Sequence, residues 1–258
     1  MEKPTAIDTE QTIQLIKYAR IRELFFTTNY WTRQFPIYVL AKQLINLGHI
    51  GEVKSIRGDL GFQAVYNDSD YYDRFFNPQL GGGAMNDLGG YLISYFLEFS
   101  RSPLIPLVRS EGEKVGDVDT AVSFLLGKSG VFSVSILRDS SFDVQLLGSH
   151  GIIDFKASAI APSTIDLTVR VDANSRNASL IPFPCCAQPL AFIQKFHYSL
   201  PNSSGFRCYP GTAGFLYMVQ SIEDCFSKGG CQQLPGLTDD DQILISKITD
   251  QVLEKMES

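Results

Sequence analysis

The segment from Gly81 to Tyr91 holds the residues of this 258-residue chain whose types and spacing best suit chemistry. Three consecutive glycines give the backbone freedom to turn tightly or to approach a ligand closely. The mostly apolar run from Tyr91 to Phe99 predicts a helix, on which Asp87 and Tyr91 share a face because they are four residues apart. A carboxylate that orients a phenol is suited to acid and base catalysis. The structural alternative is that Asp87 is simply the anion that a helix N-terminus favours.

Lys3 and the pair Trp31 and Arg33 are the other candidates. A lysine between the end of a strand and a helix would lie where α/β sheets bind ligands, at the carboxyl ends of the strands. On spacing alone, an exposed lysine near a terminus explains Lys3 better. Trp31, the only tryptophan, and Arg33 also stand between a predicted strand and a predicted helix. They could line a pocket, or they could wedge the helix against a sheet.

Composition excludes several classes of protein. A net charge of −6 and the absence of a Lys/Arg cluster argue against a nucleic-acid surface. Hydrophobic residues make up 44% and charged residues 19% of the chain, which is ordinary for a soluble globular protein. The apolar runs are too short to span a bilayer, so we expect no membrane association through a spanning helix.

The cysteines and histidines indicate neither a disulfide framework nor a metal site. Five cysteines lie in the last third of the chain without C-x-x-C spacing, which predicts reduced thiols in a cytoplasmic protein. The three histidines have no ligand-type partner at a suitable spacing, so we expect no bound metal.

The first fifty residues alternate between helix and strand patterns, as in α/β proteins. Asp8 begins a capping-box-like start to a helix that runs to about Arg20. Residues 24–26 follow as a short buried strand. Pro36 opens a second helix, and Gly48 ends it.

Beyond Glu52 the pattern changes to strands joined by short turns, which predicts a mainly antiparallel sheet. The predicted strands cover Ile56–Phe62, Ala121–Leu126, Val131–Leu137, Phe142–Leu147, Ile152–Phe155 and Ile165–Val171. Residues 174–210 are rich in Pro, Ser and Asn and predict a long loop. Two helices close the chain, one near 213–227 and one capped by Thr238 with Asp241 at its third position.

Four motifs occur together in the order and spacing of one family, and the chain resembles the glucose–fructose oxidoreductase/inositol dehydrogenase family. They are Glu2-Lys3-Pro4, Trp31-Thr32-Arg33-x-Phe35-Pro36, Gly48-x-Ile50-Gly51-Glu52-Val53 and Gly81-Gly82-Gly83-Ala84-x-x-Asp87-Leu88-Gly89-x-Tyr91. The resemblance implies an α/β remnant plus an α+β domain with an open, mainly antiparallel sheet flanked by helices. Residues 1–30 would be the remnant of an NAD(P)-binding Rossmann domain. Residues 31–258 would form a substrate-binding and dimerisation domain, whose C-terminal helices pack back toward the Rossmann side.

The resemblance also implies a site and a reaction. Lys3 and Pro4 would lie beside the nicotinamide of NADP, with Lys3 polarising the substrate hydroxyl. Tyr91 would be the acid/base residue, and Asp87 would bind or orient the substrate. The reaction would transfer a hydride from a diol or sugar hydroxyl to NADP, as in members of the family that oxidise dihydrodiols or D-xylose.

Two further implications concern the pocket and the assembly. Trp31 and Arg33 would shape the substrate pocket. The sheet beyond residue 105 would serve as the surface of a homodimer. Thr28 departs from the family pattern, which usually has glutamate after that strand.

The glycine fingerprint of a nucleotide-binding strand and helix does not precede Lys3, because only two residues do. Three alternatives therefore stay open. The chain is the substrate domain of a dehydrogenase, a non-catalytic relative that acts as a binding or dimerisation module, or the product of an incomplete gene prediction. We expect the 258-residue chain alone to be inactive and to show no measurable binding of NADPH.

Overall fold

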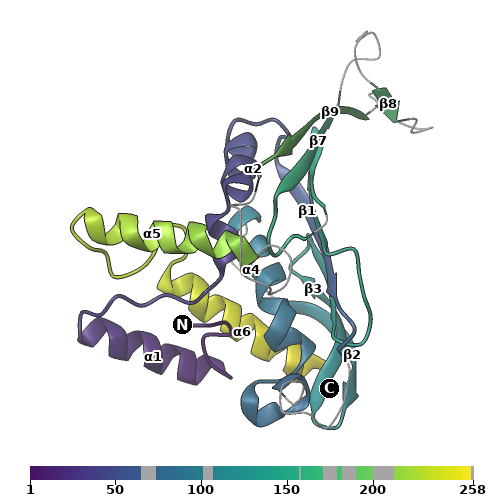
Figure 1. Ribbon diagram of the computed structural model, residues 1–258. Helices are drawn as coiled ribbons and strands as arrows, with labels where there is room; N and C mark the ends of the chain where they lie inside the picture. The colour runs from purple at the N-terminus through teal and green to yellow at the C-terminus, as the bar shows by residue number, and fades with distance from the viewer. Residues whose placement is uncertain are drawn as a thin grey trace.

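The computed structural model describes residues 1–64, 74–100, 107–156, 158–170, 179–181, 190–199 and 212–256. Its helices gather on one side of a tall sheet (Figure 1).

A nine-stranded sheet in the order β2-β3-β4-β1-β5-β6-β7-β9-β8 forms the body of the structure. Neighbouring strands pair antiparallel, except that β1 and β4 are parallel. The expectation of an open, mainly antiparallel sheet is therefore confirmed. The strands are β1 (Val53–Gly61), β2 (Leu107–Val115), β3 (Val118–Leu126), β4 (Gly130–Ser135), β5 (Asp143–Gly148), β6 (Gly151–Phe155), β7 (Thr164–Arg170), β8 (Ser179–Ile181) and β9 (Leu190–His197).

Helices cover one face of this sheet, and no helix among the described residues covers the other (Figure 1). The core lies between the covered face and α4, where the rings of Phe96 and Phe132 meet edge to face with centroids 6.1 Å apart. The helices are α1 (Thr9–Ile21), α2 (Pro36–Asn46), α4 (Gly90–Phe99), α5 (Phe215–Ser227) and α6 (Asp239–Met256). Short turns of other helix types are η1 (Trp31–Gln34), η2 (Pro78–Leu80), η3 (Met85–Gly89) and η4 (Thr212–Gly214).

Local capping sets the ends of two helices where the sequence predicts them. The side chain of Asp8 accepts a hydrogen bond from the Gln11 amide and caps α1. Thr238 and Asp241 cap α6 reciprocally, each side chain accepting from the other residue's backbone amide. Such pairs satisfy amides that the first helical turn leaves without a partner.

The first helix packs on the last one. Ile16 of α1 is buried against the body, and Arg20 forms an ion pair with Asp239 at 2.5 Å. At the other end of α1, the Thr9 amide and hydroxyl both donate to the Asp250 carboxylate. The N-terminal residues and the C-terminal helix therefore hold each other.

Two predictions about the backbone were wrong. Residues 24–26 are not a strand, because the Leu24 amide donates to the Ala19 carbonyl of α1 and the Phe26 amide donates to the Gln232 carbonyl, outside any sheet. The predicted loop 174–210 contains β8 and β9 within its described parts, since β9 finds its partner in the distant β7. The remainder of that loop lies outside the described residues.

The cysteine prediction was also wrong in one place. Cys225 near the end of α5 and Cys231 form a disulfide across a six-residue separation. Gly229 and Gly230 both take positive φ angles between them, which turns the chain back toward the helix. The other three cysteines lie outside the described residues.

Candidate active site

Lys3 is held in place by an extended N-terminal segment that runs beside residues 27–29. The terminal ammonium of Met1 donates to the Thr27 carbonyl at 2.8 Å. The Asn29 amide donates to the Met1 carbonyl, also at 2.8 Å. Lys3 therefore follows a segment whose backbone is tied to a distant part of the chain.

Thr28, where the chain departs from the expected family pattern, strengthens this attachment. Its amide and hydroxyl both lie within hydrogen-bonding distance of the Gln242 side-chain oxygen, at 3.0 and 2.8 Å. The Thr5 hydroxyl lies 2.7 Å from the Thr28 hydroxyl. All three side chains are buried, so the bonds join the N-terminal segment to α6 in a low-dielectric setting.

The structure brings Lys3, Asp87 and Tyr91 together, and we call these residues the Lys3 cluster. Lys3 Nζ donates to the Asp87 carboxylate at 2.8 Å and to the Asp87 backbone carbonyl. The same ammonium lies 5.2 Å from the centroid of the Tyr91 ring. The side chains of Lys3 and Asp87 are 14% and 12% exposed, so an edge of each is accessible.

A wide turn precedes the helix of Tyr91. Residues Met85–Gly89 form a single π-helical turn before α4 begins at Gly90. Such turns are rare and occur frequently at functional sites. Asp87 lies within this turn and Tyr91 lies just after it, and Lys3 contacts both. The expected helix from 91 to 99 is thereby confirmed, with its start moved by one residue.

The glycine loop before this turn is tightly packed. Gly83 has φ +111°, and a Cβ built there would lie 2.1 Å from a carboxylate oxygen of Asp119. A Cβ on Gly82 would lie 2.8 Å from two backbone carbonyl oxygens. The glycines are therefore required by close contacts within the protein.

Asp119 on β3 is a structural residue that the sequence analysis missed. Its carboxylate accepts from the Met85 amide at 2.7 Å and so occupies the N-terminal end of the helical segment. Burial raises the pKa of Asp119, and the bond from Met85 opposes that rise. Asp119 is the only charged residue in the strand Val118–Leu126. A single carboxylate in an otherwise uncharged strand was the sequence feature that could have indicated its structural role.

Tyr30 is a second residue that the sequence analysis missed. Its ring meets the Tyr91 ring edge to face, with centroids 6.0 Å apart. Burial raises the pKa of Tyr30 well above the ordinary range of a phenol, so its hydroxyl stays protonated at neutral pH. A Cβ on Gly90 would lie 2.5 Å from the Tyr30 hydroxyl, so glycine there permits the close approach.

Trp31 and Arg33 lie in the core instead of at the Lys3 cluster. Trp31 is 1% exposed and stacks on Phe215, with centroids 4.1 Å apart. Arg33 is 6% exposed, and its guanidinium bonds to Ser94 of α4. The Arg33 guanidinium also donates to the Gly236 carbonyl and pairs with Asp241 and Glu98, which are not members of the cluster. The expected contact of Trp31 and Arg33 with substrate stays a prediction.

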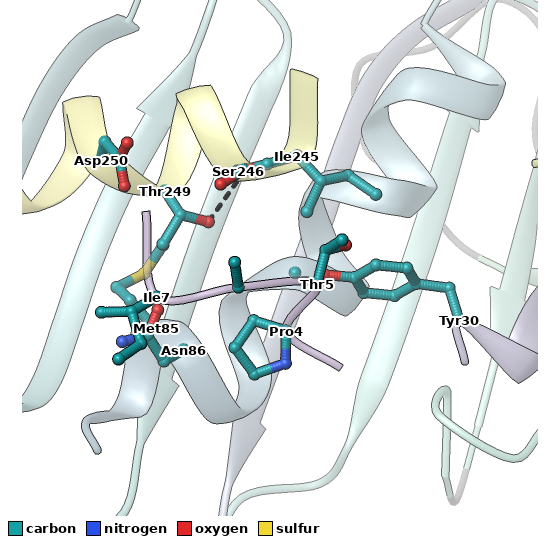
Figure 2. A pocket seen from close by; sticks show the side chains of 12 residues that line it. Pro4, Thr5, Ile7, Tyr30, Met85, Asn86, Ile245, Ser246, Thr249 and Asp250 are labelled. Atoms are coloured by element: carbon teal, nitrogen blue, oxygen red, sulfur yellow. Dashed lines mark hydrogen bonds between the residues drawn. The ribbon is translucent and has the colours of Figure 1, made fainter. Parts of the chain in front are cut away.

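A small cavity lies between the N-terminal segment and α6, beside Pro4 (Figure 2). Its lining includes Tyr30, Asn86 and Asp250. The cavity volume is about 10 Å³, which holds about one water molecule and no sugar.

The residues present fit the reacting end of a nicotinamide cofactor and not its phosphates. A cationic lysine beside a phenol suits a site where a hydroxyl loses its proton. A pyrophosphate needs free backbone amides at a helix N-terminus. In the segment after the glycine loop, the Met85 amide already donates to the Asp119 carboxylate and is not free for a phosphate.

Comparison with known proteins identifies the class. Residues 38–154 match the profile of the GFO/IDH/MocA C-terminal domain. The chain is 26% identical over 261 residues to the trans-1,2-dihydrobenzene-1,2-diol dehydrogenase of Xenopus tropicalis, covering 99% of this chain and 70% of that protein. It is 32% identical over 214 residues to the NADP(+) D-xylose 1-dehydrogenase of Hypocrea jecorina, covering 73% of this chain and 53% of that protein.

Solved structures share the fold. A levoglucosan dehydrogenase in complex with NADH and levoglucosan superposes with a TM-score of 0.77 at 16% identity, covering 99% of this chain and 70% of that one. An aldose–aldose oxidoreductase from Caulobacter crescentus, complexed with glycerol, superposes with a TM-score of 0.72 at 14% identity. The match covers 99% of this chain and 69% of that one.

Two features are absent from the described residues. No helix in these parts of the chain is long and apolar enough to cross a membrane. No group of three or more His, Cys, Asp or Glu side chains within them is arranged to hold a metal ion.

Proposed function

We propose that this chain forms the substrate side of an NADP-linked dehydrogenase that oxidises a hydroxyl of a small diol or sugar. The observation that carries the proposal is the position of the Lys3 ammonium, bonded to Asp87 and 5.2 Å from the Tyr91 ring centroid. Relatives named as dihydrodiol and D-xylose dehydrogenases, and the nicotinamide complexes among the similar folds, support it.

Each residue of the cluster has a separate role in this proposal. Tyr91 takes the proton of the substrate hydroxyl, because a nearby ammonium favours the phenolate form of a phenol. Lys3 stabilises the negative charge that develops on the substrate oxygen. Asp87 orients Lys3 through the 2.8 Å bond and leaves an accessible edge for a second hydroxyl. NADP, when bound, supplies the acceptor for the hydride, and Lys3 and Pro4 are the residues proposed to lie beside it.

The proposal is tested by measuring the turnover of the natural protein that contains these residues, with NADP and either trans-1,2-dihydrobenzene-1,2-diol or D-xylose. Tyr91→Phe should lower kcat by about two to four orders of magnitude, the usual contribution of a general acid or base. Tyr18→Phe is the control, because Tyr18 is 55% exposed on α1, away from the cluster. Unchanged turnover in Tyr91→Phe would remove Tyr91 from the role.

The second candidate function is a binding or dimerisation module without catalysis. It is favoured by the Met85 amide, which already donates to the Asp119 carboxylate and is therefore not free to hold a phosphate. Turnover in the assay above separates the two candidates, and titrating the 258-residue chain with NADPH while following its fluorescence tests whether this chain holds the cofactor by itself. We expect no binding by this chain alone, and micromolar binding would show that residues 1–258 hold the cofactor themselves.

We also propose that the uncovered face of the sheet forms a homodimer interface. Val131 on this face is 46% exposed, while the next residue, Phe132, is buried toward the helices. The open face seen in Figure 1 supports this arrangement. A cytoplasmic location stays a prediction from the sequence.

A further inference from the structure

Arg33 makes contacts on every side of its guanidinium. Nε donates to the Ser94 hydroxyl at 2.8 Å, and one terminal nitrogen donates to the Ser94 carbonyl at 3.1 Å. The other terminal nitrogen donates to the Gly236 carbonyl at 2.7 Å and lies 3.2 Å from Asp241 and 3.5 Å from Glu98. A planar guanidinium with five fixed donors suits such a multiple contact, whereas a lysine ammonium does not.

These contacts join three elements at one point. Arg33 belongs to η1, Ser94 and Glu98 belong to α4, and Asp241 caps the start of α6. The Arg33 side chain is 3% exposed, so water competes little for its hydrogen bonds and ion pairs. Arg33 therefore ties α4 to η1 and to the start of α6.

The segment that contains Arg33 also contacts Tyr91, the residue proposed as acid and base. Ser94 follows Tyr91 by three residues, so the two lie one helical turn apart. Tyr30, which directly precedes η1, packs edge to face on the Tyr91 ring. The segment from Tyr30 to Arg33 thus holds α4 at two successive turns.

We infer that Arg33 is a positioning residue, which acts through Ser94 to keep Tyr91 beside Lys3. The inference rests on the proposed function, and it assigns Arg33 a role other than contact with substrate. If Arg33 contacted the substrate, replacing it would mainly raise KM. If Arg33 positions Tyr91, replacing it mainly lowers kcat, because the reacting groups are misplaced while the pocket remains.

The sharpest variant is Ser94→Ala, which removes the acceptor of Arg33 Nε and leaves Arg33 in place. We expect kcat of the complete protein to fall about tenfold, the scale of one hydrogen bond to a charged group, with KM within about twofold. The matched control is Ser100→Ala at the end of α4, because the buried Ser100 hydroxyl has no hydrogen-bond partner among the described residues. Ser100→Ala should leave kcat unchanged. A rise in KM without a fall in kcat would overturn the inference.

Arg33 itself is tested by Arg33→Lys and Arg33→Met. Both should lower kcat, Arg33→Met by about a hundredfold, the scale of a small misplacement of a reacting group. In a Tyr91→Phe background, Ser94→Ala should cause no further loss, because Arg33 acts through Tyr91. An equal loss in both backgrounds would mean general damage and would overturn the inference.

Hydrogen exchange supplies a readout that does not depend on activity. Ser94→Ala should speed amide exchange in residues 91–95, and Ser100→Ala should not. If no substrate is oxidised by the wild type, the proposed function fails, while this measurement still tests whether Arg33 positions α4. Unchanged exchange in residues 91–95 would overturn the positioning role.

Discussion

Lys3 and Asp87 are 84 residues apart in the chain, and their side chains meet at 2.8 Å. Each is held by a different mechanism. Backbone bonds between Met1 and residues 27 and 29 direct Lys3. A π-helical turn after a packed glycine loop directs Asp87. The ion pair is therefore the point where two separately supported segments join, and its loss should affect the site more than the fold.

Replacing Lys3 by methionine removes this ammonium while keeping most of the side-chain volume. We expect kcat of the complete protein to fall by about two to three orders of magnitude, because a donor aimed at developing negative charge is lost. Lys54→Met is the control, since Lys54 is 57% exposed and pairs only with the neighbouring Glu52 among the described residues. Steady-state kinetics at neutral pH measure both. Equal activity of Lys3→Met and wild type would exclude Lys3 from the reaction.

Replacing Gly83 by alanine should destabilise the fold more than the same replacement at Gly48, another glycine with a positive φ angle. Gly48 at φ +81° has no atom within 4 Å of the place a Cβ would take, so Gly48→Ala should cost only the backbone strain, about 1–2 kcal/mol. Gly83→Ala adds a collision with Asp119 at 2.1 Å and should cost about 3 kcal/mol or more. Urea unfolding of the 258-residue chain measures the difference. Equal costs at the two positions would show that the Asp119 contact is absent in solution.

Asp119 should make stability depend on pH in a defined direction. Burial raises its pKa in the folded protein above the ordinary value of 3.8, so the folded state binds this proton more tightly than the unfolded chain. The stability that the protonated carboxyl contributes is therefore lost as pH rises from about 3.8 through the raised pKa. Asp119→Asn keeps an oxygen for the Met85 amide and cannot ionise.

The free energy of unfolding of the wild type, relative to Asp119→Asn, should consequently fall as pH rises across this window and become constant above it. Urea unfolding at a series of pH values provides the measurement. A relative stability that rises with pH would contradict the assignment.

Val131→Arg tests the proposed dimer surface. A charge placed in the interface would be desolvated without a partner, so the variant should sediment as a monomer where the wild type sediments as a dimer. Val219 on α5 is equally exposed, at 48% against 46% for Val131, and lies outside the sheet. Val219→Arg should leave the dimer intact. If Val131→Arg remained dimeric, the interface would have to lie elsewhere.

Short-range chemistry explains what the sequence by itself determined. The caps at Asp8 and Thr238 act within three residues, so the starts of α1 and α6 could be predicted. Apolar alternation predicted most strands, and an apolar run predicted α4, because burial on one face imposes a period. The Lys3 cluster was expected through the resemblance of four motifs to a family. No local pattern joins Lys3 to Asp87.

Long-range packing decided the rest. β9 is a strand because β7 offers it a partner, and no local signal revealed that pairing. Gly83 needs to be glycine because Asp119 lies against it, 36 residues further along the chain. Arg33 could have lined a pocket or held a helix, and the arrival of α4 and α6 around it placed its charge in the core. Such contacts depend on elements that meet only in the folded chain, and only the tertiary structure could decide them.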